Sequence, residues 1–272
     1  MCAELPEIAR RLRVSIIENS HRSQTPHLGS CLSCVDILVS LYYRSLRIDP
    51  RNPRDPDRDR FILSKGHAAP ALFHVLALKG FFPESMLQAY GEDGSVFGAH
   101  PPTPEQLPGV EAATGSLGHG LSLGLGMALA ARIQRRCHNV YALLSDGECN
   151  EGAVWEAAML AAAQRAERLC VIVDFNGWQA TDRSREVMAL EPLTSKWRSF
   201  GWDACEVDGH DIQSLTDVLG RVPNGTGRPM AVVAHTVKGK GVSFMEDDNN
   251  WHYRIPSAEE VSMAKKELGE LA

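Results

Sequence analysis

Short apolar runs in the second half of the chain constrain its fold more than any other feature. They lie at 140–144, 169–173 and 230–234, with a shorter run near 204–207. Stretches of helical character, such as 153–166 and 212–219, separate them. Runs that are apolar on both faces are typical of parallel strands covered by helices on each side. The alternation therefore predicts an α/β fold with a doubly wound, mostly parallel sheet, and ligands at the carboxyl ends of the strands.

The first part of the chain adds helices and loops to this core. Apolar residues three or four apart predict two helices, one through Leu5, Ile8, Leu12 and Ile16 and one through Val35, Leu38, Val39 and Tyr42. A loop over 21–30 joins them, in which proline and glycine flank His27 and hold its ring on a stiff connection. The segment 49–60 carries four aspartates and three prolines and is predicted to be a surface loop.

A glycine-rich run over 117–133 is predicted to form a buried helix. Its small residues, such as Gly120 and Gly124, recur at near-helical spacing, which favours a tight helix contact across a subunit interface. The run is too short and too rich in glycine for a membrane span, and residues 1–13 lack the continuous apolar stretch of a signal peptide. We therefore expect no membrane partner. No linker divides the chain, so we also expect one domain over 1–272.

Charge and cysteine usage exclude several other functions. With 28 Lys and Arg against 34 Asp and Glu the net charge is -6, so no basic field exists to attract a nucleic acid. The seven cysteines are odd in number and unclustered apart from Cys31 and Cys34, as in a reduced cytoplasmic protein. Cys31 and Cys34 have the spacing of a redox pair, but they stand at a predicted helix start and no second pair completes a zinc site, so we expect a structural role.

Polar residues follow two of the apolar runs. Asp146 comes after 140–144, just before a predicted helix. Asn176 follows 169–173, which should form the neighbouring strand, so the two side chains meet over one crevice. Mg²⁺ prefers octahedral oxygen coordination and usually takes only some of its ligands from protein. A carboxylate, a carboxamide and a backbone carbonyl at this edge therefore predict a magnesium site for a diphosphate cofactor.

At these residues the chain resembles the transketolase family. Asp146-Gly147 followed by Asn176 matches the family's thiamine diphosphate motif, and five further segments occur in family order. The segments are Thr25-Pro26-His27-Leu28-Gly29-Ser30, Ser64-Lys65-Gly66-His67-Ala68, Gly98-Ala99-His100-Pro101, Thr114-Gly115-Ser116-Leu117-Gly118-His119-Gly120, and Lys238-Gly239-Lys240-Gly241 leading to Trp251-His252. The resemblance covers nearly the whole chain and implies the thiamine diphosphate-binding fold.

The resemblance implies roles for particular residues. For Mg²⁺ it implies Asp146, Asn176 and the backbone carbonyl of Trp178. For thiamine diphosphate it implies Ser30, Lys65, His67, Gly115, Ser116, Leu117, Asp146, Gly147, Glu148, Asn176, Lys238 and His252. For catalysis it implies His27, His67, His100 and His252, whose imidazoles can move protons on sugar hydroxyls, and Glu151. Glu151 and Glu156 stand where family glutamates link two active sites through a dimer interface.

The resemblance also implies an activity and a partner. A family enzyme transfers a two-carbon ketol unit from a ketose or ketose phosphate donor to an aldehyde acceptor, through a thiamine diphosphate enamine intermediate. It also needs a pyrimidine-binding domain and a smaller third domain, which we expect on a separate chain. The chain is therefore expected to be the N-terminal subunit of a split transketolase, active only with a C-terminal subunit in an α2β2 heterotetramer.

Some positions depart from the family pattern. They are Ser145 and Tyr253 in place of glycines, Leu28 in place of a proline, and His119 in place of a glutamine. The turn Asn176-Gly177-Trp178 is also unusual, because a basic and then an aliphatic residue are common there. His119 and Tyr253 could reshape the mouth of the site, so the acceptor need not be a pentose phosphate.

Two other functions stay open on these residues. One is the α subunit of another thiamine diphosphate enzyme, such as a 2-oxoacid dehydrogenase, although the set of histidines argues against it. The other is a non-catalytic regulatory subunit that binds the cofactor without turnover. A nicotinamide-binding Rossmann enzyme is excluded, because no predicted strand leads into Gly-x-Gly-x-x-Gly with an acidic residue about 20 positions later.

Overall fold

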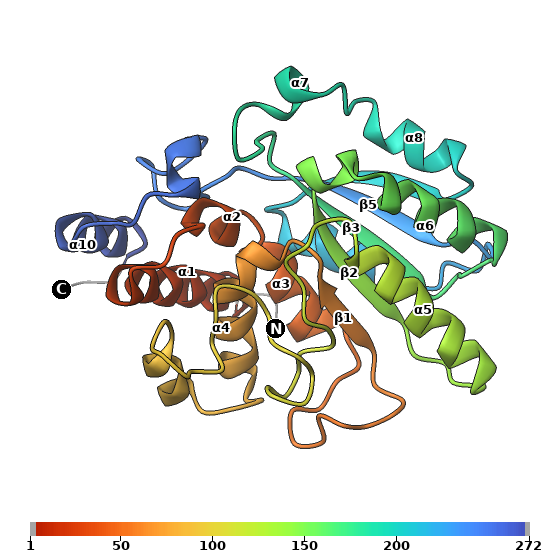
Figure 1. The fold of residues 1–272 in the computed structure, drawn as a ribbon, viewed down its shortest axis with the longest axis horizontal. Coiled ribbons are helices and arrows are strands. Elements are labelled where there is room, and N and C mark those ends of the chain that lie inside the picture. The colour runs from red at the N-terminus through yellow and green to blue at the C-terminus, as the bar shows by residue number, and fades with distance from the viewer. Residues whose placement is uncertain (1–3, 270–272) are drawn as a thin grey trace.

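The described part of the chain, residues 4–269 of this computed structural model, is built around a sheet of five parallel strands. The strands are β1 (Arg60–Leu63), β2 (Val140–Ser145), β3 (Leu169–Phe175), β4 (Asp203–Asp208) and β5 (Met230–His235). Their order across the sheet is β1-β2-β3-β5-β4, and helices cover both faces (Figure 1). The predicted doubly wound parallel sheet is confirmed, and each of the apolar runs forms a strand.

Helices of varied length connect and cover these strands. They are α1 (Glu4–Ser23), α2 (Leu28–Ser33), α3 (Val35–Ser40), α4 (Ala69–Lys79), α5 (Gly120–Ile133), α6 (Gly152–Ala163), α7 (Ser184–Val187), α8 (Leu193–Ser199), α9 (Ile212–Leu219) and α10 (Ala258–Glu267). Short 3₁₀ turns occur at Gly66–Ala68, Glu84–Ala89, Gly147–Asn150 and Asn249–His252, and a π turn at Leu41–Ser45. Local capping sets some of these boundaries: the Asp211 carboxylate accepts the first free N–H groups of α9, and Ser257 and Glu260 form a capping box on α10.

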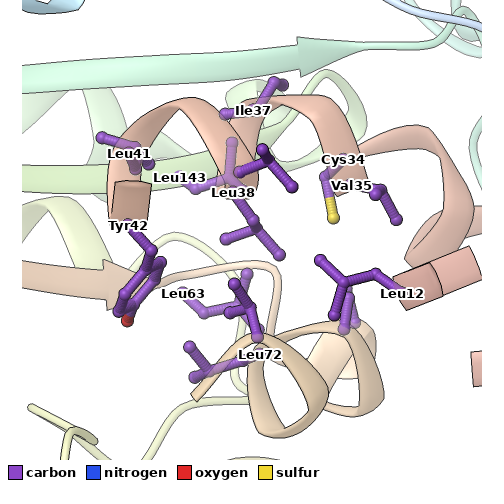
Figure 2. Close-up of a cluster of buried hydrophobic side chains, with 14 of the residues drawn as sticks. Leu12, Cys34, Val35, Ile37, Leu38, Leu41, Tyr42, Leu63, Leu72 and Leu143 are labelled. Atoms are coloured by element: carbon purple, nitrogen blue, oxygen red, sulfur yellow. The ribbon is translucent and has the colours of Figure 1, made fainter. Parts of the chain in front are cut away.

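The strands send alternate side chains into two apolar layers. Tyr141 and Leu143 of β2 face a layer formed with α1, α3, α4 and α9. Val140, Ala142 and Leu144 face the other layer, formed with α5, α6 and α8. Figure 2 shows part of the first layer, where side chains of α1, α3, α4 and the sheet meet: Leu12, Leu38, Leu63, Leu72 and Leu143. Because both faces are covered, a ligand approaches this sheet at the ends of its strands.

One predicted loop and one predicted helix differ from the structure. The loop predicted over 21–30 is mostly helical, because α1 continues to Ser23 and α2 already begins at Leu28. His27 lies in the remaining link and adopts a left-handed backbone, with φ 71°. The helix predicted through Val35, Leu38, Val39 and Tyr42 is α-helical only as far as Ser40 in α3, and Tyr42 lies in the π turn Leu41–Ser45.

The sequence prediction missed β1. Its apolar part, 61–63, is too short to show strand periodicity, and the loop predicted over 49–60 runs into it, because Arg60 already pairs with Val140. Asp59 is also buried rather than on the surface, because its carboxylate accepts the backbone N–H groups of Arg47 (2.9 Å) and Asn139 (2.7 Å). The rest of the loop is exposed or half-buried, as predicted.

Helix α5 is only partly the buried helix that was predicted. It starts at Gly120, and its outer face is open, with Leu123 41% and Ile133 81% exposed. Gly120 and Gly124 face the sheet of the same chain: a Cβ on Gly120 would lie 2.2 Å from the Ser64 hydroxyl, and one on Gly124 would lie 3.4 Å from Val140, whereas Gly126 faces open space. The close contact of Gly120 and Gly124 is therefore with the sheet of the same chain, and not with a helix across a subunit interface as predicted.

The structure does not describe the two ends of the predicted single domain. Residues 1–3, Cys2 among them, and 270–272 of the predicted single domain lie outside the described residues. Within 4–269, no helix combines the length and the apolar character that crossing a membrane requires.

Candidate functional site

Loops from four strands meet at the carboxyl edge of the sheet. Lys65 follows β1, Asp146 follows β2, Asn176 follows β3 and Lys238 follows β5. Parallel strands all end at the same edge, so these residues come together although the sequence separates them widely. The prediction that the ends of the apolar runs carry the polar groups is confirmed.

Asp146 is fully buried at the end of β2 and forms no ion pair with any described residue. Its carboxylate accepts the N–H of Gly147 (2.9 Å), the N–H of Gly177 (2.9 Å) and the hydroxyl of Ser184 (2.7 Å). Burial raises the pKa of Asp146 to about 6, because the ionised form loses its hydration. A buried carboxylate without a counter-ion is suited to a cation.

Asn176 lies at the end of the strand next to Asp146. It is nearly buried, and its side-chain oxygen accepts the N–H of Trp178 at 3.1 Å. Among the described residues, no group of three histidine, cysteine or acidic side chains could hold a metal. A cation at this edge would therefore rely on a carboxylate, an amide, backbone carbonyls and ligand oxygens, a set that Mg²⁺ prefers.

Lys65 and Asp174 form a fully buried ion pair beneath this turn. The Lys65 ammonium also donates to the carbonyl of Ser30 (3.0 Å), and the Asp174 carboxylate accepts from the hydroxyls of Ser33 (2.6 Å) and Thr236. Burial alone would lower the pKa of Lys65 and raise that of Asp174, but their mutual attraction outweighs it and shifts both in the opposite directions. Both groups are therefore charged, and the pair joins α2, β1, β3 and β5.

Lys238 is a buried cation of a different kind. Its side chain is 1% exposed, and the ammonium donates to the side-chain oxygen of Asn249 (2.6 Å) and lies 3.4 Å from Nδ1 of His252. None of the described carboxylates forms an ion pair with it. Burial lowers the pKa of Lys238 to about 8, and the charge of Lys65 contributes to the same shift. An ammonium buried without a counter-ion is suited to an anion such as a phosphate.

Three histidine rings meet beside Lys238. The ring centroids of His27 and His252 lie 5.0 Å apart, and each lies 5.6 Å from that of His67. The N–H of His27 donates to the carbonyl of His252 (2.9 Å), which holds the two loops together. Burial, helped by the charges of neighbouring lysines and histidines, lowers the pKa of His27 to about 4, that of His252 to about 3 and that of His67 well below its ordinary value. All three imidazoles are therefore neutral at neutral pH and can accept or donate a proton.

The loop 114–118 borders this cluster. Gly115 has φ 150°, and an added Cβ would lie 2.7 Å from the ring of His100, so a side chain does not fit there. His100 is exposed. Ser116 is exposed and Leu117 is half-buried on the same loop. Such close approach of the backbone is typical of loops that bind phosphate groups.

Ser30 and Glu148 are buried in contacts with other parts of the protein. Ser30 provides its carbonyl to Lys65, as described above. The Glu148 carboxylate accepts from the Ser64 hydroxyl and from the N–H groups of Gly118 (2.8 Å) and Ser145 (3.2 Å). Glu148 thereby ties the loop 114–118 to the end of β2, and both residues hold the loops that surround Asp146.

Glu151 and Glu156 are exposed, one just before α6 and one within it. Glu151 packs against the loop 114–118, since a Cβ on Gly118 would lie 2.7 Å from the Cβ of Glu151. Apolar side chains are exposed on α5 and α6 as well, with Leu123 41% and Met159 53% exposed. This face of α5 and α6 therefore combines apolar and acidic side chains.

The unusual residues of the sequence border the site. The Trp178 ring lies under the Arg183 guanidinium, 3.7 Å from its centroid. Tyr253 is 64% exposed, and its ring centroid lies 4.7 Å from that of His252. His119 is exposed beside the loop 114–118. Tyr253 is thus the unusual residue that lies against the histidine cluster.

Three residues of the site were not predicted from the sequence. Asp174, Ser184 and Asn249 are the partners of the buried Lys65, Asp146 and Lys238, respectively. Asp174 offered a signal, because it is an acidic residue directly after an apolar run. Ser184 and Asn249 offered none, because they are polar loop residues whose partners depend on the fold.

The cysteines agree with the structural role that was expected. Cys31 and Cys34 are fully buried free thiols, and burial raises the pKa of each to about 12. Thiols that stay protonated in this way are unreactive.

Comparisons with known proteins find relatives along the whole chain. Residues 5–271 match the family described as "Transketolase, thiamine diphosphate binding domain". The chain is 40% identical over 267 residues to one subunit of the apulose-4-phosphate transketolase of Actinobacillus succinogenes, covering 97% of this chain and 96% of that protein. It is 38% identical over 243 residues to "6-deoxy-6-sulfo-D-fructose transketolase subunit SqwG" of a Clostridium species, covering 89% and 88%.

Solved structures show the same fold. The transketolase from Leishmania mexicana superposes with a TM-score of 0.90 at 26% identity, covering 97% of this chain and 41% of that one. The chain therefore spans nearly the full length of the two subunit relatives but about two fifths of the length of this solved enzyme.

Proposed function

The chain belongs to the transketolase family, as the thiamine diphosphate-binding subunit of a two-component transferase, and from this premise we propose how its residues bind the cofactor and which sugars it acts on. The reaction is the transfer of a two-carbon ketol unit from a ketose donor to an aldehyde acceptor. This chain works together with its partner.

Two buried charges without counter-ions carry this proposal. Asp146 and Lys238 have opposite charges, lie at the same edge of the sheet, and have no ion-pair partner among residues 4–269. Each costs free energy when left alone in the protein interior. A divalent cation with a diphosphate group would compensate both at once, so these residues fit the magnesium complex of thiamine diphosphate.

The proposed ligands follow from this fit. Asp146, the side-chain oxygen of Asn176 and the carbonyl of Trp178 hold Mg²⁺. Lys238 supplies positive charge to the diphosphate, and His67, His252 and the close-packed backbone at Gly115 and Gly147 surround the cofactor; the wider set is Ser30, Lys65, Ser116, Leu117 and Glu148. When bound, thiamine diphosphate supplies the nucleophilic carbon that carries the two-carbon unit.

The histidine cluster then acts on the sugars. Neutral His27, His67 and His252 can accept a proton from one sugar hydroxyl and donate one to a developing alkoxide. His100, which is exposed beside them, can bind the part of the sugar that points toward solvent. Depressed pKa values suit this exchange, because an imidazolium could not accept a proton.

The substrate is proposed to be a ketose with an anionic group from a specialised route. The names of two relatives refer to apulose-4-phosphate and to 6-deoxy-6-sulfo-D-fructose, which carry a phosphate and a sulfonate. We propose that Tyr253, exposed against His252, and the exposed His119 contact the far end of such a sugar. We therefore expect the acceptor preference to differ from that of a pentose phosphate enzyme.

The partner is proposed to be a C-terminal subunit with the pyrimidine-binding domain, in an α2β2 heterotetramer in the cytoplasm. The outer face of α5 and α6 fits a subunit interface, because it exposes Leu123 and Met159 next to Glu151 and Glu156. In this arrangement Glu151 and Glu156 lie in the interface and link the two active sites.

A pull-down of the tagged chain from its native cells, with Mg²⁺ and thiamine diphosphate present, tests the proposal. We expect mass spectrometry to identify a stoichiometric companion with a pyrimidine-binding domain. The purified pair should transfer a ketol unit from a ketose phosphate or sulfo-ketose to aldehydes, and only with both cofactors. Recovery of the chain only with itself, or CO₂ release from a 2-oxoacid in place of ketol transfer, would overturn the proposal.

A further inference from the structure

A histidine outside the site, His210, holds the backbone of the loop that carries Lys238. His210 follows β4, and its Nε2 accepts the N–H of Val237, the residue before Lys238, at 2.8 Å. The turn before His210 is pressed against the end of β5, because a Cβ on Gly209 would lie 2.3 Å from Thr236. This histidine therefore contacts the loop backbone one residue from the buried ammonium.

The hydrogen bonds assign one tautomer to His210. A backbone N–H can only donate, so Nε2 carries no proton. The other nitrogen, Nδ1, lies 2.8 Å from a carboxylate oxygen of Asp36, which can only accept while ionised. His210 is therefore neutral, with its proton on Nδ1 and its lone pair directed at Val237.

Asp36 is itself held in place by Arg13. The Arg13 guanidinium donates to both carboxylate oxygens, at 3.1 and 2.6 Å, and both side chains are nearly buried. Arg13 and His210 together hold the pKa of Asp36 below its usual value, although burial alone would raise it. The carboxylate thus stays ionised and fixes the orientation of the His210 ring.

The same three residues hold both sides of Lys238. Nε of Arg13 donates to the carbonyl of Lys240 at 3.0 Å, while His210 accepts from Val237. Between these anchors, the carbonyl of Lys238 accepts the N–H of Asp247 at 2.8 Å. The backbone on each side of Lys238 is therefore fixed by side chains of α1, α3 and the β4–α9 turn, far from Lys238 in sequence.

We propose that His210 is a positioning residue for the diphosphate site. Held by Asp36 in its Nδ1–H tautomer, it fixes the Val237 amide and so aims the Lys238 ammonium at the phosphate groups. This inference rests on the proposed role of Lys238. It adds a second set of residues, Arg13, Asp36 and His210, on which cofactor affinity depends without contact to the cofactor.

Two substitutions at one position separate the two contacts of the ring. In His210→Gln the longer amide can place its oxygen near the position of Nε2 and still accept from Val237. In His210→Asn the amide can reach Asp36 but leaves the Val237 N–H without an acceptor. In the two-subunit enzyme with Mg²⁺, we expect calorimetry to show thiamine diphosphate binding weakened tenfold or more by His210→Asn and less than threefold by His210→Gln.

Combining His210→Asn with Lys238→Ala tests whether the effect passes through Lys238. If it does, His210→Asn weakens cofactor binding less than twofold further once Lys238 is replaced. An equal loss with and without Lys238 would show that His210 supports the fold in general, and would overturn the inference. If Lys238→Ala alone leaves the affinity unchanged, the proposed role of Lys238 fails; if it weakens binding while His210→Asn does not, only the positioning role fails.

A spectroscopic measurement on the unsubstituted protein does not depend on how the variants fold. With ¹⁵N-labelled histidine, we expect the His210 ring to show a protonated Nδ1 and an unprotonated Nε2 at neutral pH. A ring protonated on Nε2 would offer no acceptor to the Val237 N–H, and would overturn the inference.

Discussion

Burial has opposite effects on stability in the interior of the sheet and at its carboxyl edge. In the interior, residues such as Val171 and Ile172 of β3 are fully buried among apolar neighbours, and their burial stabilises the fold. At the edge, Asp146 and Lys238 are as deeply buried but lack counter-ions within the described chain. The buried charges at the edge therefore lower stability but allow a charged ligand to bind. Substitutions at the edge should change ligand binding, and substitutions in the interior should change stability.

The largest effect should come from removing the buried carboxylate at the edge. We expect Asp146→Ala or Asn176→Ala to leave no measurable Mg²⁺-dependent binding of thiamine diphosphate by calorimetry, because the cation loses a ligand. Asp93→Ala, at an exposed aspartate, serves as the matched control. Unchanged affinity in either edge variant would contradict the metal assignment.

Breaking the buried ion pair between Lys65 and Asp174 should lower the stability of the fold. Lys65→Met leaves the Asp174 charge buried without a partner, so we expect the free energy of unfolding to fall by about 3–5 kcal/mol in urea titrations. Replacing both residues, by Lys65→Met with Asp174→Leu, should recover most of that loss. Arg51→Met, at an exposed ion pair, should leave the unfolding midpoint unchanged. A loss of less than about 1 kcal/mol in unfolding free energy for Lys65→Met alone would contradict this, and would mean that buried charges without counter-ions cost little at this edge.

The interior layer beside α4 contains a titratable ring, that of His74. His74 is nearly buried, and burial lowers its pKa to about 4 from 6.5, so the unfolded chain binds more protons between these values. Its contribution to stability is complete above pH 6.5 and is lost as the pH falls from there through 4, by about 3 kcal/mol. We expect His74→Gln to reduce the acid dependence of the unfolding free energy, measured in urea at several pH values. An identical pH dependence in the variant would contradict this.

The histidine cluster should affect turnover more than binding. In the two-subunit enzyme, we expect His27→Ala or His252→Ala to lower kcat about 10–100-fold, as for loss of a proton-transfer group, while cofactor affinity changes less than threefold. Steady-state rates and cofactor titration of the same preparations would check this. If a variant mainly weakens cofactor binding, that histidine contacts the diphosphate and not the sugar.

The smallest effect should come from the interior itself. Ile172→Val removes one buried methylene, so we expect a loss of about 1 kcal/mol in unfolding free energy and unchanged cofactor affinity. Urea titration and calorimetry together provide the check. A change in affinity would mean that the interior layer also shapes the site.

Much of the fold could be predicted because local patterns repeat along β2, β3 and β5. Their apolar runs are long enough to show burial on both faces, whereas the short 61–63 run of β1 was hidden behind a polar loop. Asp146 and Asn176 were predicted to follow neighbouring strands, and the pairing of β2 with β3 confirms that placement. Glu151, which was grouped with the histidines by resemblance, is exposed at the start of α6, and its catalytic role stays a prediction.

The order and spacing of side chains were enough to predict the parallel sheet, the family and the residues that follow β2 and β3, although β1 was missed. Only the tertiary structure decided which charges are paired. Lys65 meets Asp174 across 109 positions and His210 meets Asp36 across 174, while Asp146 and Lys238 meet no opposite charge within the described residues. The physical reason is that pKa and binding capacity depend on desolvation and on distances of a few ångströms, and both arise when distant segments pack against one another.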